Sequence, residues 1–383
     1  MKEPKIRFKG FSGEWKECTL SNIITVNSGK DYKHLEKGTI PVYGTGGYML
    51  SVNTSLSEHD AIGIGRKGTI DKPQYLKAPF WTVDTLFFLT TNNGDNLDFL
   101  FNLSQNIRWQ KYDESTGVPS LSKNNIDKIK TCIPNKFEQQ SVASFFTSLD
   151  AQISASTTRL ASLKQMKAAS LQAMFPQEGE TVPKVRFKGF EGEWKKVKLS
   201  ECLEISTTRN LNNEYGVNEV LSVSDEEGVM NQIKLLGRSY AGKSVTNYKI
   251  LRTNQVVYTK SPLKAKPYGI VKVNKGETGI VSVLYAVYDA KECVSPDYIH
   301  YYFEPTFRIN NYLLPLINKG AKNTMNISDE VSLQGDIILP NTLEEQLRIV
   351  EYLQSLDRQI ALHTQRLEKL KQIKAACLDK MFV

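Results

Sequence analysis

Two long stretches of the chain carry apolar side chains along one helical face. In each stretch these positions are separated by four, seven, three and eleven residues, which is typical of an amphipathic helix with a narrow apolar stripe. Each stretch follows a proline and begins with glutamate, as helix N-termini often do. The pattern predicts two long helices, over residues 138–175 and 344–383.

A narrow apolar stripe on a long helix needs a partner, and each predicted helix is the obvious partner of the other. Because only three to four heptads are present in each, an ordinary core helix remains the alternative. We expect the two helices to pair as a coiled coil through Leu149, Ile153, Leu160, Leu163, Leu356, Ile360, Leu367 and Leu370.

The two helical stretches belong to an internal repeat. Residues 138–175 and 345–382 are identical at 19 of 38 positions, and residues 4–21 and 183–200 are identical at 13 of 18. Residues 22–132 and 201–338, which lie between the matched segments, show no alignment that we would defend. The chain therefore has two similar frames that carry different inserts.

The inserts are rich in Gly, Tyr, Asn and β-branched residues in short alternating runs, which predicts mixed modules of mainly strands and turns. The expected fold class is thus α+β. The expected organisation is a first module over 1–137, a helix over 138–175, a linker over 176–184, a second module over 185–343 and a helix over 344–383.

Charge and composition narrow the function. The 49 Lys and Arg residues exceed the 41 Asp and Glu residues by eight, which favours a polyanionic partner. The sequence shows no run apolar enough for a membrane span and no signal peptide, and its five cysteines are scattered. We therefore expect a cytoplasmic protein with reduced thiols, no membrane partner and no metal site.

Two glycine-rich turns are candidate binding elements in the first module. The first, within residues 40–48, could let the backbone approach a ligand closely or could equally form a plain hairpin. Residues 63–68 match G-x-G-x-x-G, but the residues that follow make a poor helix start, so a dinucleotide site is disfavoured. A strand followed by a tight turn that presents basic side chains to DNA is the better interpretation, and a solvated turn is its alternative. The candidate DNA-binding residues here are Gly44, Thr45, Gly46, Arg66, Lys67 and Thr69.

Residues 237–244 formally fit the P-loop pattern, but the sequence after them resembles a strand rather than the helix that a nucleotide site requires. Residues 230–275 hold ten Lys or Arg and no Asp or Glu, which favours phosphate contacts over lysines that merely face solvent. The candidate DNA-binding residues here are Arg238, Lys243, Ser244, Lys260, Lys264 and Lys266.

The repeated Arg-Phe-Lys-Gly-Phe-x-Gly-Glu-Trp segment recurs identically in both halves, at residues 7–15 and 186–194. Its aromatic residues are expected to dock each module onto the shared frame rather than to stack on bases. No catalytic constellation is recognisable, which favours a binding protein over an enzyme.

The alternation of variable modules with repeated helices resembles the DNA-specificity subunit of type I restriction–modification enzymes. The similarity covers essentially the whole chain. Its carriers are the Glu-Gln start, Leu-Asp pair and Arg-Leu pair of each helix, the segments 43–47, 65–70 and 80–85, and, in the second module, 243–250 and 318–320.

The resemblance implies two target-recognition domains that each read one half of an asymmetric, bipartite DNA site, on helices paired antiparallel. It implies two methylase subunits and restriction/translocase subunits as partners. S-adenosylmethionine, ATP and Mg are then expected in those partner subunits, with no cofactor and no catalysis in this chain. A two-module architectural or adaptor protein that binds nucleic acid is the alternative from a different class.

Overall fold

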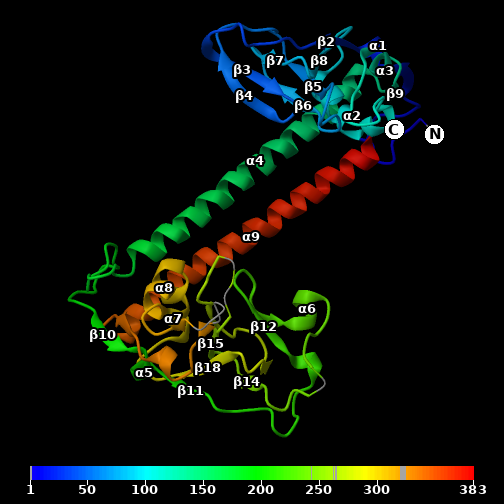
Figure 1. Cartoon of the computed structure of the whole chain (residues 1–383). Helices are drawn as coiled ribbons and strands as arrows, with labels where there is room; N and C mark the ends of the chain where they lie inside the picture. Colours follow the sequence, from blue (N-terminus) through cyan, green and yellow to red (C-terminus); the bar gives the residue numbers. More distant parts are fainter. Residues whose placement is uncertain (1, 243, 262, 264, 320–324) are drawn as a thin grey trace. The chain divides into compact units, whose positions relative to one another are not determined.

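The computed structural model describes residues 2–242, 244–261, 263, 265–319 and 325–383 (Figure 1). The chain divides into two compact units: unit 1 comprises residues 1–159 and 363–383, and unit 2 comprises residues 160–362. The boundary between the units crosses both long helices, α4 (Lys136–Ala173) and α9 (Leu343–Met381). The compact units therefore differ from the sequence-based division, in which each helix is a segment of its own.

Unit 1 is built around an antiparallel sheet with the strand order β2-β8-β5-β6. A second sheet has the order β4-β3-β7, and β1 pairs with β9. The elements before α4 are β1 (Lys16–Thr19), α1 (Leu20–Ile23), β2 (Ile24–Ser28), β3 (Lys37–Gly44), β4 (Gly47–Val52), β5 (Ala61–Gly65), β6 (Gln74–Leu76), β7 (Trp81–Thr82), β8 (Leu86–Thr91), α2 (Leu97–Asn106), a 3-10 turn (Trp109–Tyr112), α3 (Lys123–Asp127) and β9 (Lys130–Ile133).

The central strands of unit 1 read as continuous apolar runs because both faces of the sheet are covered. Ile62 and Ile64 of β5 join the core that contains Phe99 of α2. Their neighbour Ala61 points to the opposite core, together with Val42 of β3. The sheet is thus buried between a helix and a second sheet.

Unit 2 repeats this plan, with the sheet order β11-β18-β15-β16 and a separate β10–β21 pair. Its elements are β10 (Lys195–Lys198), α5 (Leu199–Cys202), β11 (Leu203–Ile205), a 3-10 turn (Val217–Glu219), β12 (Leu221–Ser224), β13 (Gly228–Asn231), α6 (Gln232–Leu236), β14 (Lys249–Leu251), β15 (Val256–Thr259), β16 (Val271–Val273), β17 (Gly279–Val281), β18 (Tyr285–Ala290), α7 (Pro296–Phe303), α8 (Thr306–Leu313), β19 (Asn318–Lys319), β20 (Met325–Asn326), a 3-10 turn (Val331–Leu333) and β21 (Asp336–Leu339).

The two modules therefore share a central fold that sequence comparison did not detect. The first strand, β2 or β11, pairs with the last strand of the sheet, β8 or β18, and a helix follows, α2 or α7. The modules differ in what is inserted between these strands: β3, β4 and β7 in unit 1, and β12, β13, α6, β14 and β17 in unit 2. The sequences of the two modules have therefore diverged in the sheet as well as in the inserts, while the strand order of the sheet is kept.

Within each unit, the first half of one long helix lies against the second half of the other. In unit 1, Lys374 of α9 forms an ion pair with Asp150 of α4 (Nζ–Oδ1 2.6 Å). In unit 2, Lys167 of α4 forms the equivalent pair with Asp357 of α9 (Nζ–Oδ1 2.7 Å). The helices therefore run antiparallel, which confirms the expected coiled-coil frame.

The apolar side chains predicted to pair the two helices are either buried or half-buried. Leu149, Leu163, Leu356 and Leu367 are buried. The other members of the predicted set are half-buried: Ile153, Leu160, Ile360 and Leu370. Each unit thus holds two residues of the set from each helix, as expected for a narrow stripe on paired helices.

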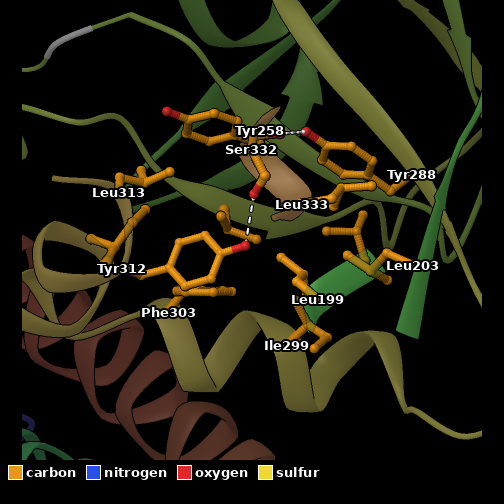
Figure 2. A pocket seen from close by; sticks show the side chains of 13 residues that line it. Leu199, Leu203, Tyr258, Tyr288, Ile299, Phe303, Tyr312, Leu313, Ser332 and Leu333 are labelled. Carbon is orange, nitrogen blue, oxygen red and sulfur yellow. Dashed lines mark hydrogen bonds between the residues drawn. The ribbon is translucent and has the colours of Figure 1, made fainter. Parts of the chain in front are cut away.

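The interior of unit 2 contains a small apolar cavity lined in part by Ile299 and Phe303 of α7 (Figure 2). Its volume is about 20 Å³, about the space that one water molecule needs. Among its few polar groups, Tyr312 Oη donates to Ser332 O (2.7 Å) and Tyr288 Oη is hydrogen-bonded to Ser332 Oγ (2.5 Å). The cavity is a packing gap in the core rather than a ligand site.

Candidate nucleic-acid interface

Each module is fastened to the helical frame by an arginine that grips a buried glutamate. In unit 1, Arg7 Nε and Nη2 donate to Glu138 Oε1 and Oε2, each at 2.7 Å, and Arg7 Nη1 donates to Gly13 O (2.6 Å). Trp15 Nε1 also donates to Glu138 Oε1 (3.3 Å). We call this arrangement of arginine, tryptophan and glutamate the clasp. Glu138 is 1% exposed, and its charge is tolerated in the interior because both carboxylate oxygens are paired.

Unit 2 contains the same clasp. Arg186 Nε and Nη2 donate to Glu345 Oε1 and Oε2 at 2.7 and 2.9 Å, and Trp194 Nε1 donates to Glu345 Oε1 (3.3 Å). The repeated aromatic residues pack beside the clasps: Phe8 on Phe145 of α4, with ring centroids 5.9 Å apart, and Phe187 on Tyr352 of α9 at 6.0 Å. The prediction that the repeated segment docks each module onto the frame is confirmed for these residues.

In the first module, the structure brings the two predicted glycine-rich turns together. Gln74 of β6 donates from Nε2 to Gly44 O (3.0 Å) and Thr45 O (3.2 Å), which ties the β3–β4 turn to the edge of the sheet. A Cβ atom placed on Gly68 would lie 3.8 Å from Thr45 Oγ1, so the two turns lie next to each other. Sequence patterns gave no signal for the positioning role of Gln74.

The side chains of Arg66 and Lys67 are exposed at the end of the buried strand β5. The Arg66 backbone N–H donates to Thr85 O (2.8 Å), and its guanidinium lies 5.7 Å from the centre of the Phe87 ring. The backbone is therefore fixed while the charged groups face solvent. Of the other predicted residues, Gly46 is exposed, Thr45 and Thr69 are half-buried, and Gly44 is buried in the turn.

The structure removes both nucleotide-binding alternatives. No helix follows Gly68: the next element is the strand β6, which starts at Gln74. After Ser244 the chain makes a turn and enters the strand β14 at Lys249. A phosphate therefore has no helix N-terminus to bind at either motif.

In the second module, Arg238 is exposed and lies over the ring of Tyr240, 4.6 Å from its centre. Gln232 Oε1 accepts a hydrogen bond from Tyr240 N (2.6 Å), which holds this turn against α6. Ser244 is exposed, and its hydroxyl is hydrogen-bonded to Thr246 Oγ1 (2.9 Å). The predicted residues Lys243 and Lys264 lie outside the described residues.

Several of the basic residues between 230 and 275 are paired with acids from outside that window. Lys260 contacts Asp329 (Nζ–Oδ1 2.7 Å), which also pairs with Lys249. Lys266 contacts Asp225 (Nζ–Oδ1 2.8 Å) and donates to Glu304 O (3.0 Å). A count within one window could not reveal these partners, and DNA contact by Lys260 and Lys266 stays a prediction.

Burial and ion pairing have opposite effects on the pKa of the Asp329 carboxyl. Burial raises the pKa of Asp329, but hydrogen bonds from Lys249 and Lys260 lower it more, and the net pKa lies below its ordinary value. The ion pairs therefore hold the surrounding strands together at neutral pH. Phosphate contact by Lys260 would require it to exchange this carboxylate for the backbone of a nucleic acid.

The described residues include neither a helix suited to span a membrane nor a group of side chains suited to bind a metal. Within the ranges given above, no helix is both long and apolar enough to cross a membrane. In the same part of the chain, no group of three or more His, Cys, Asp or Glu side chains is placed to hold a metal ion.

Comparison with known proteins places this architecture, two loop-bearing modules on a duplicated helical frame, among the DNA-specificity proteins. The family model described as "Type I restriction modification DNA specificity domain" matches residues 12–165 and again residues 191–372. The chain therefore belongs to the type I restriction–modification DNA-specificity family. No curated protein sequence matches it.

A solved structure that is similar to this chain has the same fold. The S subunit of a type I restriction–modification system from M. genitalium aligns with a TM-score of 0.68 at 11% identity, over 100% of this chain and 99% of that one. A chain from a structure of type I R-M complex assembly aligns with a TM-score of 0.48 at 15% identity, over 96% and 97%. The HsdS subunit of Thermoanaerobacter tengcongensis aligns with a TM-score of 0.43 at 16% identity, over 100% and 99%.

Proposed function

We propose that this chain is a DNA-specificity subunit that reads a bipartite, asymmetric DNA site, one half with each module. The supporting observation is that both modules have the same sheet order and the same clasp, yet carry different inserts. A shared frame with unlike reading loops suits a site with unlike halves, whereas two identical modules would favour a palindrome.

The chemistry on DNA belongs, in this proposal, to partner subunits. The family is a DNA-specificity domain, and the described part of this chain offers a pair of turns with exposed cations rather than a catalytic centre. Two methylase subunits and restriction/translocase subunits assemble on the frame in the cytoplasm. S-adenosylmethionine, ATP and Mg bind in those subunits.

The duplicated frame supports the number of methylases. The clasp and the antiparallel ion pair each occur once per unit with the same residue types. Equivalent surfaces bind equivalent partners, so two copies of one subunit are expected per chain.

Adenine-methylation mapping tests this function. Cells that express the chain together with its methylase should gain methylation at one motif with two specific halves and a fixed non-specific spacer. A continuous motif, a palindrome, or no methylase co-purifying with the chain would contradict the proposal, and the last result would favour the adaptor alternative.

A further inference from the structure

A third loop joins the two glycine-rich turns of the first module. Gly68 N donates to Pro119 O (2.8 Å), and Leu121 N donates to Arg66 O (2.9 Å). The turn that carries Arg66 and Lys67 is thereby fixed against the segment 114–121. The sequence of this segment contains no charge cluster or glycine motif that would indicate a binding role.

This loop is held rigidly from its base. Asp113 Oδ1 accepts three hydrogen bonds: from Ser115 N (3.0 Å), Ser115 Oγ (2.9 Å) and Ser120 N (2.9 Å). The loop closes with a backbone bond from Glu114 N to Ser120 O (3.1 Å). Pro119 further restricts the backbone beside the tip.

An apolar side chain stands at the tip of this fixed loop. Val118 is 66% exposed, although valine is normally buried. On β4, which follows the first glycine-rich turn, Tyr48 and Met49 are also exposed, at 63% and 49%. Exposed apolar groups on preorganised backbone beside the cations of Arg66 and Lys67 suit a partner with both phosphates and apolar surface.

We propose that Val118 is a specificity-determining residue that contacts the C5-methyl group of a thymine in the half-site read by the first module. The thymine methyl is the apolar feature of the major groove that distinguishes an A·T pair, and aliphatic side chains are its usual contacts. Arg66 and Lys67 bind neighbouring phosphates or base edges and set the register of the loop. Asp113 is the positioning residue. This proposal rests on the proposed function.

The test removes methyl groups from each side of the contact. The methylase complex is prepared with the full chain, either wild type or Val118→Ala, and its motif is mapped by methylation. Synthetic duplexes of that motif then carry deoxyuridine in place of each thymine of the first half-site in turn, so that only the C5-methyl is lost. Val182→Ala, an exposed valine in the linker (46%), is the matched control.

At one thymine, deoxyuridine should weaken binding of the wild-type and Val182→Ala complexes by roughly three- to tenfold, and should leave binding of the Val118→Ala complex unchanged. Equal losses in all three complexes at every position would overturn the role of Val118, as would a first half-site without an A·T pair. The absence of any bipartite motif for the wild-type complex would instead overturn the proposed function itself.

Substitutions of Asp113 test its positioning role independently of Val118. Because all three hydrogen bonds converge on one oxygen, Asp113→Asn can retain them and should keep the wild-type preference for thymine over deoxyuridine. Asp113→Ala should lose that preference while the second half-site is still read. If Asp113→Ala kept the full preference, the loop would not depend on its anchor and the positioning role would be wrong.

Discussion

At the scale of single residues, both units depend on buried charges that are fully paired. Glu138 and Glu345 are 1% and 2% exposed, and each accepts hydrogen bonds from an arginine and a tryptophan of the repeated segment that lie 123 to 159 residues earlier in the chain. The sequence indicated that these residues recur, since they are identical in both halves. It could not indicate which of them meet, because the partners are far apart along the chain.

Removing one carboxylate charge should weaken a clasp strongly. Glu345→Gln leaves the Arg186 guanidinium without its counter-charge, and breaking a buried pair from one side costs about 3–5 kcal/mol. We expect hydrogen exchange in urea to show that free-energy loss for the amides of unit 2. The neighbouring Glu344→Gln, at an exposed position, should change stability by less than about 0.5 kcal/mol. Similar effects of the two substitutions would contradict the role of the clasp.

His300 makes the stability of unit 2 depend on pH. Burial, reinforced by the charge of Lys272, lowers the pKa of His300 to about 3, while its Nδ1 lies 3.2 Å from Val271 O. The unfolded chain takes up this proton near pH 6.5 and the folded chain does not, so stability is fully present above pH 6.5 and falls as the pH decreases toward 3.

The measurement is the free energy of unfolding of unit 2 at pH 7 and pH 5. The wild type should lose about 2 kcal/mol over this interval through His300, and His300→Gln should lose correspondingly less. An equally steep decline in the two proteins would show that another group is responsible.

At the scale of elements, the helices were predictable and the sheets were not. The stripe and the repeat placed the helices at 138–175 and 344–383, and the structure has them at Lys136–Ala173 and Leu343–Met381. Helical periodicity survives divergence because a long helix repeats its pattern many times. A strand of three to six residues repeats it once or twice, so the common sheet order of the two modules left no detectable alignment.

The end of each helix completes the core of a module. Phe382, which follows α9, lies 5.4 Å from Phe99 and 6.2 Å from Trp15, measured between ring centres in unit 1. Phe175, which follows α4, packs in the same way against Trp194 and Tyr298 in unit 2. Each helix therefore begins in one unit and ends in the hydrophobic core of the other.

Truncating Phe382 should thus destabilise unit 1, although the residue is next to the last in the sequence. We expect Phe382→Ala to cost about 3–5 kcal/mol in unit 1 and to leave unit 2 unchanged, as read by hydrogen exchange. Val383→Ala, at a position 45% exposed, is the control and should have little effect. Equal losses in both units after Phe382→Ala would refute the packing described here.

At the scale of the whole molecule, we assign the reading of DNA to the two modules and the spacing of the two half-sites to the helices. The sequence predicted the candidate turns of the first module, which the structure places next to each other at Thr45 and Gly68. It overestimated the free positive charge of the second module, because Asp225 and Asp329 lie outside the basic segment that they neutralise. Charge patterns along a chain cannot show pairing that depends on tertiary structure.

If the helices set the distance between the two half-sites, a change in helix length should change the length of the non-specific spacer in the DNA motif. Insertion of four residues, about one turn, between 150 and 160 of α4 adds about 6 Å of helix. Methylation mapping should then show a changed spacer between two unchanged half-sites. An unaltered spacer in an active complex would exclude the helix as the ruler.

The sharpest test of whether each module reads one half-site is a module exchange. Residues 22–132 are replaced by the corresponding segment of another member of the family, with both clasps and both helices retained, and the methylated motif is mapped in cells that express the methylase. We expect one half-site to change while the other half-site stays the same. A change in both halves, or in neither, would contradict the assignment of one half-site to each module.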